Sequence, residues 1–259
     1  MKHTTLITLL ASAALAAGGC TKQEAPSTAD GVGTLRIDTR PDITMTTRAQ
    51  IEITPAPEAG DFALTITGTD YNRSWESIPA FNEADESLKA GNYTARIVCG
   101  DAKAEGVDKP CYEGELAFTI VARQESRETI PARIVNSQVA VTSTEAFRQY
   151  FHEATFTVTT SAGNRFTFTP GSGDEKAVFV EAGTRLTLTG TAKLQSQTGT
   201  AFDRTYTFPE QTLEQTVART RHTFCFDARD NGSATVTINL DDNYLEERTI
   251  TVELNGDAQ

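Results

Sequence analysis

The chain has 259 residues, of which 38% are hydrophobic and 22% are charged, and this balance excludes a wholly disordered chain. Its formal net charge is −12 and its pI is about 4.8, so its surface would repel a phosphate backbone, and nucleic acid is excluded as a partner. The length is compatible with one or two domains.

The first twenty residues have the pattern of an export signal. Lys2 is followed by an uncharged, mostly apolar run over residues 6–17, which is shorter than the roughly 20 residues that span a bilayer. Two glycines and Cys20 come directly after this run. Small residues before a cysteine resemble the bacterial lipobox, although Ala17 stands where the lipobox usually has a large aliphatic residue. The alternative is an ordinary signal peptide with an incidental cysteine.

We therefore predict a lipoprotein signal peptide over residues 1–19 and lipidation of Cys20. Residues 20–32 are polar and small and include Pro and Gly, which predicts a disordered tether. About 12 such residues have a root-mean-square span of roughly 20 Å. The acyl chains, rather than the acidic protein surface, would then hold the chain at the membrane. The predicted location is the cell outer membrane, with the body facing the periplasm or the cell surface.

From Gly33 onward the dominant hydrophobic period is two, which predicts β-strands. Threonine fills many of the alternate positions, as on the solvated face of a sheet. Alternation of this kind occurs over residues 35–38, 51–54, 62–67, 93–97, 116–120, 156–158, 166–168, 186–188, 224–226, 236–240 and 250–254. Asn231-Gly232 lies between two of these segments and predicts a hairpin, because both turn positions need a positive φ.

Residues 144–152 have helical rather than strand spacing. Thr144 can cap a helix, and Phe147 and Phe151 are four residues apart, which places them on one helix face. We predict one short helix here, inside an otherwise all-β chain.

A faint internal repeat suggests two related units. Residues 88–92 (LKAGN) recur as residues 180–184 (VEAGT), in each case before a predicted strand. The alternative is chance, since Ala-Gly before a strand is common. Short strands separated by turn signals favour sandwiches. We predict an all-β chain of two tandem immunoglobulin-like β-sandwich domains, residues 33–133 and residues 134–259, packed end to end with the short helix in the second.

The order of several short motifs resembles an uncharacterised family of Bacteroidales lipoproteins with tandem β-sandwich domains. The motifs are GTLRIDT, SWESIP, LKAGNYTARI, PCYEGELAFTI and EAFRQYF, and the similarity spans roughly residues 33–256. The resemblance implies an envelope lipoprotein of immunoglobulin-like or transthyretin-like fold with no established activity. It also implies architectural roles for residues 91–93 and 112–114. Cys111 stands where the family often has another residue.

Three cysteines follow Cys20 in the sequence. Cys99 ends one predicted strand and Cys111 begins the next, and an exported chain meets an oxidising compartment, so we predict a disulfide between them. Closing a loop of this size would stabilise the fold by roughly 3 kcal/mol. The alternative is unpaired thiols. Cys225 has no base beside it in the sequence and no assigned partner.

No constellation of catalytic or metal-binding residues stands out. His152 begins a pattern like a zinc-protease motif, but Phe156 occupies the position of the second histidine. A zinc site that combines His152, His222 and a cysteine has no ligand spacing to support it. The acidic turns at 227–231 and 241–247 could bind calcium, although turns favour the same residues for local hydrogen bonding. We predict no catalytic residues, no metal and no cofactor.

Tyr71 and Trp75 lie in a polar segment and could stack on a sugar ring. The alternative is that Trp75 packs against a sheet. We predict a non-enzymatic, lipid-anchored envelope protein that presents its sandwiches for adhesion, assembly or binding of a glycan or protein ligand. Two alternatives remain: a small envelope hydrolase that cleaves glycans with paired carboxylates, and a fimbrial accessory or anchor subunit whose strand 248–254 takes part in donor-strand exchange.

Overall fold

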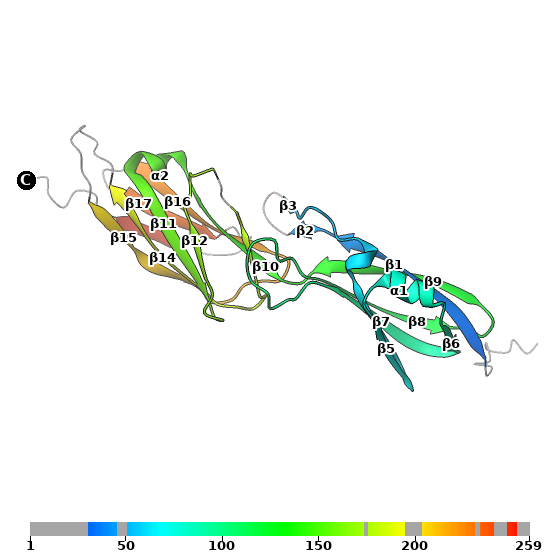
Figure 1. Ribbon diagram of the computed structural model, residues 1–259. Coiled ribbons are helices and arrows are strands. Elements are labelled where there is room, and N and C mark those ends of the chain that lie inside the picture. The colour runs from blue at the N-terminus through cyan, green and yellow to red at the C-terminus, as the bar shows by residue number, and fades with distance from the viewer. Residues whose placement is uncertain are drawn as a thin grey trace, which may run out of the picture.

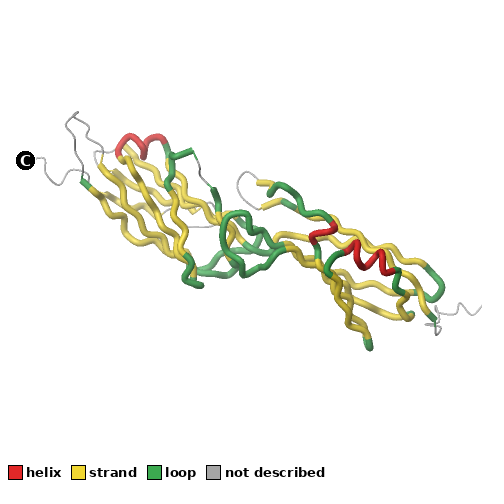
Figure 2. The backbone as a smooth tube through the Cα atoms, viewed as in Figure 1, coloured by secondary structure: helices red, strands yellow, loops and turns green. Residues whose placement is uncertain are grey.

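The computed structural model describes residues 31–45, 51–173, 176–194, 204–230, 234–240 and 248–252. The molecule is elongated and consists mainly of strands, with two groups of strands lying end to end (Figures 1 and 2). Within the described ranges, every helix is too short or too polar to cross a membrane. The all-β sandwich fold that the period-two pattern predicts is confirmed.

The first group of strands, which we call the N-terminal module, forms one curled sheet. Seven strands pair in the order β5-β4-β7-β8-β9-β1-β6, and β1 runs parallel to β9. The pair β8–β9 is joined through two residue pairs, so the sheet turns over there and its two halves enclose a shared core. The elements are β1 (Val32–Asp42), β2 (Thr44–Met45), β3 (Ile51–Glu52), the 3-10 helix η1 (Ala59–Asp61), β4 (Ala63–Gly68), β5 (Tyr71–Trp75), α1 (Ile78–Ala84), β6 (Ser87–Lys89), β7 (Gly91–Cys99), β8 (Tyr112–Ile120) and β9 (Glu125–Ile134).

The second group, the C-terminal module, is a sandwich of two sheets. One sheet has the order β12-β11-β14-β15 and the other the order β13-β10-β16-β17-β18. The elements are β10 (Ser137–Ser143), α2 (Glu145–Tyr150), β11 (Phe151–Thr160), β12 (Arg165–Phe168), β13 (Val178–Val180), β14 (Leu186–Leu194), β15 (Thr205–Leu213), β16 (Arg221–Asp230), β17 (Ala234–Leu240) and β18 (Arg248–Val252).

The two modules share one pattern of strand pairing. In each, the first strand (β1 or β10) runs parallel to a late strand (β9 or β16) and antiparallel to a short one (β6 or β13). In each, a second set pairs in the order β5-β4-β7-β8 or β12-β11-β14-β15. The repeated Ala-Gly segments follow the equivalent strands β6 and β13. This agreement favours two related units over a chance repeat, while the exact domain boundary near residue 134 stays a prediction.

Alternating apolar residues from facing strands build each core. In the C-terminal module aromatic rings dominate: Phe156 of β11 stacks on Phe226 of β16 with 3.8 Å between ring centroids, and both are fully buried. Phe147 of α2 and Phe151 at the start of β11 stack at 4.8 Å. Area-based estimates give about 1.5–3 kcal/mol for each large side chain removed from water, so this cluster is a major stabilising element.

Two short α-helices are present among the described residues, and the sequence pattern identified one of them. The helix predicted over residues 144–152 is present as α2, in which the Thr144 hydroxyl accepts a hydrogen bond from the Phe147 backbone N–H at 3.1 Å, but it ends at Tyr150, and residues 151–152 begin strand β11. Helix α1 was not predicted. Ser77 caps it in the same way, and Pro79 lies in its first turn, where the missing N–H costs nothing.

The loop between β7 and β8, residues 100–111, ties the modules together, and we call it the junction loop. Gly106 exchanges two backbone hydrogen bonds, of 2.9 and 2.8 Å, with the middle residue of β13. The Glu105 carboxylate accepts hydrogen bonds at 2.7 Å from Thr160 and Asn164 at the β11–β12 turn. One module therefore supplies the loop and the other the strand and turn that hold it.

A second set of contacts joins the modules through a side chain of the C-terminal module. Arg219, in the loop before β16, donates from Nε to the Thr44 carbonyl oxygen at 2.8 Å and forms an ion pair with Asp42. Burial opposes ionisation of Asp42, but Thr44 and Arg219 outweigh it and lower the pKa of its carboxyl. The Arg219 backbone N–H also donates to the carbonyl oxygen of Asn136, a fully buried residue whose side chain bonds to the end of the junction loop at 3.2 and 2.7 Å.

Candidate functional site

Tyr71 and Trp75, the predicted ligand platform, lie on edge strand β5 and face the core side of the sheet. Trp75 is opposite the buried Leu64 on β4, and paired residues in an antiparallel ladder share a face. Its ring meets Phe81 of α1 edge-on at 4.8 Å, and the Tyr71 ring meets Tyr93 edge-on at 5.7 Å. These inward contacts favour the packing alternative, and the role of the pair in ligand binding stays a prediction.

Charged groups flank the two rings. Arg73 lies between them on the same face of β5, with its guanidinium 5.6 Å from the Trp75 ring centroid and in an ion pair with Glu86. Burial, together with the Glu86 carboxylate, raises the pKa of Tyr71 to about 12. The Tyr71 hydroxyl therefore stays protonated at neutral pH.

A groove runs between α1 and the free edge of β1. It has a volume of about 750 Å³ and is lined by Arg36, Ile37, Asp38, Ala59, Ile78, Pro79, Asn82, Glu83, Arg127, Glu128 and Thr129. We call it the helix groove. Its apolar floor comes from β1, η1 and α1, and its rim carries two arginines and three carboxylates.

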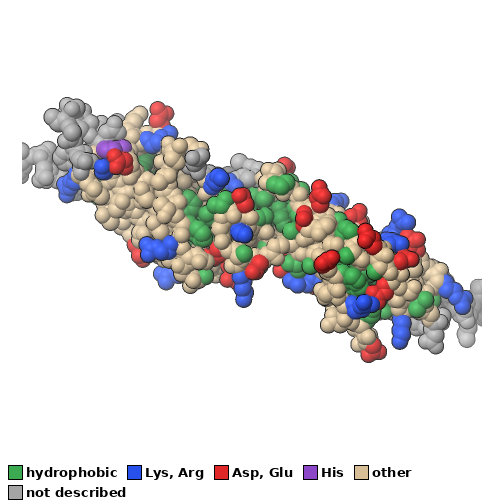
Figure 3. Space-filling model, in the orientation of Figure 1, with side chains coloured by type: hydrophobic (Ala, Val, Ile, Leu, Met, Phe, Trp, Pro, Cys, Tyr) green, Lys and Arg blue, Asp and Glu red, His purple; other side chains and the backbone are tan. Residues whose placement is uncertain are grey.

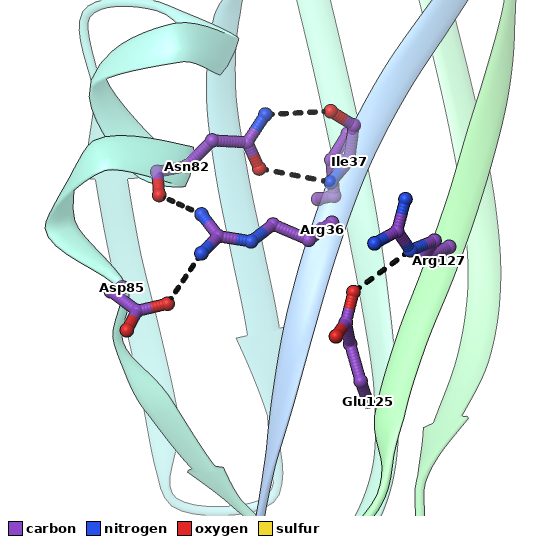
Figure 4. A network of polar contacts seen from close by, with 6 residues as sticks. All are labelled: Arg36, Ile37, Asn82, Asp85, Glu125 and Arg127. Carbon is purple, nitrogen blue, oxygen red and sulfur yellow. Dashed lines mark hydrogen bonds and ion pairs between the residues drawn. The ribbon is translucent and has the colours of Figure 1, made fainter.

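A network of polar contacts fixes one wall of the helix groove (Figure 4). The Asn82 side chain accepts from the Ile37 N–H at 3.0 Å and donates to the Ile37 carbonyl oxygen at 2.8 Å, as a neighbouring strand would. Arg36 donates to the Asn82 carbonyl oxygen and forms an ion pair with Asp85 at 2.7 Å. Arg127 of β9 binds Glu125 at 2.8 Å.

This network also closes the free edge of β1 against further strand pairing. Asn82 occupies the hydrogen-bonding groups of Ile37, the Thr39 N–H donates to Asp38 at 2.8 Å, and Pro41 has no N–H. Edge strands are commonly protected by such devices. The groove can therefore offer charged and polar side chains to a ligand, and the residues that line it include no serine, cysteine or histidine nucleophile.

A second, shallower hollow lies over the outer part of β4, β7 and β8. It has a volume of about 410 Å³ and is lined by Thr67, Gly68, Thr69, Asn92, Tyr93, Thr94, Ala117, Phe118 and Thr119. Thr119 donates to the Asn92 side chain at 2.8 Å. This lining contains no ionisable group with a pKa near neutrality, which suits hydrogen bonding rather than acid–base chemistry.

Cys99, Cys111 and Cys225 are free thiols in the structure. The ladder pairs Cys99 at the end of β7 with Tyr112 at the start of β8, and Cys111 directly precedes that pair in the chain. Burial, with Glu113, Asp101 and Cys99 nearby, raises the pKa of the Cys111 thiol to about 11, which disfavours the reactive thiolate. The predicted bridge between Cys99 and Cys111 stays a prediction, and alkylation of the unreduced protein decides it, since a bridge leaves neither thiol to be labelled.

The other residues that the sequence singled out are separate in the structure. His222 is fully buried, and its Nε2 accepts a hydrogen bond from the Val217 backbone N–H at 3.0 Å. Asp227 accepts from the Thr144 hydroxyl and the Ala228 N–H, so it supports the start of α2. The ranges that the structure describes contain no group of three metal-ligating side chains. Cys20, the hairpin residues 231–232 and the acidic turn 241–247 lie outside them.

The sequence pattern did not predict the helix groove because it did not predict helix α1, which forms one side of the groove. The local signal was present: Ser77 followed two residues later by a proline is typical of a helix start. The pairing of Asn82 with Ile37, 45 residues earlier in the chain, has no local signal, because it depends on how the sheet curls.

Comparison with solved structures finds matches among proteins of Bacteroides and Parabacteroides. A proposed polysaccharide-binding protein of Bacteroides thetaiotaomicron (DUF1812) is 7% identical, with 84% of this chain and 99% of that chain covered and a TM-score of 0.43. A proposed cell-adhesion protein of Parabacteroides distasonis is 8% identical, with 86% and 98% covered and a TM-score of 0.42. A proposed adhesin of Bacteroides thetaiotaomicron is 14% identical, with 81% and 96% covered and a TM-score of 0.38.

The sequence matches no curated protein. A family model does match, over residues 31–256, which agrees with the span of the motifs quoted above and includes both modules. The family is described as a domain of unknown function, so the match carries no activity with it. The chain belongs to the DUF4493 family.

Proposed function

We propose that this protein is a lipid-anchored, non-enzymatic protein of the outer membrane that holds its C-terminal module away from the membrane for adhesion, assembly or binding of a glycan or protein. One observation carries the proposal. The described chain begins beside β6 at one end of the rod, while α2 and the outer ends of β16 and β17 lie at the other end (Figure 1). An acyl group on Cys20 would therefore leave the C-terminal module farthest from the lipid.

The junction supports the same proposal. A rod holds its outer module at a distance only if its parts do not fold back on each other. The junction loop of the N-terminal module forms hydrogen bonds with the C-terminal module, and Arg219 of the C-terminal module forms hydrogen bonds with the N-terminal module. Apolar side chains also gather over the middle of the molecule, where the modules meet (Figure 3). Apolar contact between domains opposes their relative motion.

A non-enzymatic role is supported by the lining of the helix groove. Its ionisable side chains are arginines and carboxylates, and the arginines Arg36 and Arg127 are engaged by Asp85 and Glu125. Such a lining can hold hydroxyl or amide groups of a ligand through hydrogen bonds.

The proposal is tested by energy transfer on vesicles. The lipidated protein carries a fluorescent amino acid in place of either Gln124, beside the N-terminal end, or Glu145, in α2; both side chains are exposed. The bilayer carries an acceptor dye. We expect strong quenching of the donor at residue 124 and weak quenching at residue 145. Equal quenching would mean that the rod lies flat, and this would refute the proposed display of the C-terminal module.

A further inference from the structure

We propose that the end of the N-terminal module where the chain enters is itself a membrane-contact surface, which rests the rod on the phosphate-bearing headgroups of the bilayer that anchors it. This inference rests on the proposed lipid anchor. The surface consists of Val32, Lys89, Val121 and Arg123, and we call it the base. It adds a second, weaker contact to the acyl chains at Cys20.

The base residues come from three chain segments that the fold brings together. Val32 of β1 is the direct partner of Lys89 on β6, so their side chains share a face. The Arg123 backbone N–H donates to the Val32 carbonyl oxygen at 2.7 Å, which places the turn after β8 against the start of β1. Val121 opens that turn, and its carbonyl oxygen packs directly against Gly33.

The base exposes two apolar side chains. Val32 is 51% exposed and Val121 is 38% exposed. In the part of the chain with described side chains, four large hydrophobic residues are exposed, and the other two, Val107 and Val217, lie in the loops at the junction. Val32 and Val121 therefore lie away from the junction, where the C-terminal module does not cover them.

The charge of the base opposes the charge of the protein. The chain as a whole carries a formal −12, yet Lys89 and Arg123 are both exposed and the base itself contains no carboxylate. Blue side chains reach this right-hand end of the molecule in Figure 3. Asp70, at the tip of the neighbouring β4–β5 hairpin, carries a negative charge that partly offsets these two positive charges. Cationic side chains beside valines match a layer of phosphates over hydrocarbon.

The length of the predicted tether favours the bilayer as the occupant. Residues 20–30 precede the described chain and end directly at the base. About 12 flexible residues span roughly 20 Å, so the base could not move far from the headgroups. The tether thus keeps the effective concentration of headgroups at the base high. Headgroups would then occupy the base even if its affinity for them in solution were low.

A lysine footprint on the anchored protein tests the inference. The lipidated full-length protein is placed in vesicles that contain phosphatidylglycerol, in phosphatidylcholine vesicles and in detergent, and the rate of acetylation of each lysine is measured by mass spectrometry. Lys103, which is exposed in the junction loop, is the internal reference. We expect Lys89 to be protected about fivefold in the phosphatidylglycerol vesicles, with less protection at higher salt, and Lys103 to react equally in all three.

Two charge-reversal variants sharpen the result. Arg123→Glu is expected to remove most of the protection of Lys89. Lys176→Glu makes the same change of charge at an exposed site in the C-terminal module and is expected to leave the protection unchanged. Equal reactivity of Lys89 in vesicles and detergent, or equal effects of the two variants, would overturn the inference.

Failure of the anchor and failure of the base are distinguishable. A chain that does not float with vesicles refutes the lipid anchor before any footprint is made. The footprint is then repeated with an N-terminal hexahistidine tag on nickel-chelating lipid, which still tests the base. A chain that floats but shows no protection of Lys89 overturns the base alone.

Discussion

The side chain of Asn82 is expected to stabilise the N-terminal module by replacing a strand partner for β1. In Asn82→Ala, the N–H and carbonyl oxygen of Ile37 lose their hydrogen bonds of 3.0 and 2.8 Å. Ile37 is buried, and a buried group left unpaired costs about 1–3 kcal/mol. Since Asn82 itself is half-buried and water can reach part of the site, we expect a loss of about 2–3 kcal/mol for the two groups together.

The single tryptophan supplies the assay. Trp75 packs on Phe81 of α1, so its fluorescence during urea unfolding reports on the N-terminal module. Asn92→Ala is the matched control, because Asn92 is exposed and accepts from the exposed hydroxyl of Thr119; it is expected to cost less than about 0.5 kcal/mol. If Asn82→Ala is no less stable than Asn92→Ala, the edge-capping role of Asn82 is refuted.

Three further predictions concern the cores and the pH dependence. Phe226→Ala removes the ring stacked on Phe156 and is expected to cost about 3–5 kcal/mol in calorimetry, with the Trp75 transition much less affected; equal shifts of both would mean that the modules unfold as one unit. Gly190→Ala would place a Cβ 2.1 Å from the Phe156 ring and is expected to lower the free energy of unfolding by about 3 kcal/mol or more. Its control is Gly60→Ala, whose Cβ would have no atom within 4 Å and which should change stability by about 0.5 kcal/mol or less. Similar values for the two variants would contradict the packing at β14. Burial raises the pKa of Tyr71 and of Tyr112 to about 12, against about 10 in the unfolded chain, so the folded state resists ionisation and stability should fall as the pH rises from about 10 toward 12. Tyrosinate absorbance that titrates completely near pH 10 while circular dichroism remains native would contradict this.

Much of the architecture was predictable because apolar and polar residues alternate along many of the strands, and this pattern can be read from neighbouring residues in the sequence. Predicted runs of alternating residues coincide with β1, β4, β7, β8, β11, β12, β14 and β16, as in Phe62, Leu64 and Ile66, all of which are buried, whereas no run was predicted over β9, β10 or β15. Helix α2 was predictable because its cap, Thr144, directly precedes it in the sequence, but the spacing of Phe147 and Phe151 extended the predicted helix into β11. The Ala-Gly repeat pointed to two related units, and the strand pairing agrees with it.

The features that position the candidate site were not predictable in the same way. The helix groove depends on contacts between β1, α1 and β9, which lie far apart in the sequence and meet because the sheet curls at β8–β9. The predicted pairing of Cys99 with Cys111 rests on their closeness in the chain, and it stays a prediction. The ties at the junction through Glu105 and Arg219 likewise join residues 55 to 177 positions apart.

The central claim is that this rod is held at a membrane by a lipid on Cys20, and the mass of the N-terminal peptide tests it most directly. The protein is extracted from the membranes of the cells that make it, digested, and the N-terminal peptide is weighed. We expect a peptide that begins at Cys20 and carries a diacylglycerol thioether, and we expect Cys20→Ser to release the protein from the membrane fraction. An N-terminal peptide with an unmodified Cys20, or a Cys20→Ser protein that stays in the membrane fraction, would contradict the account.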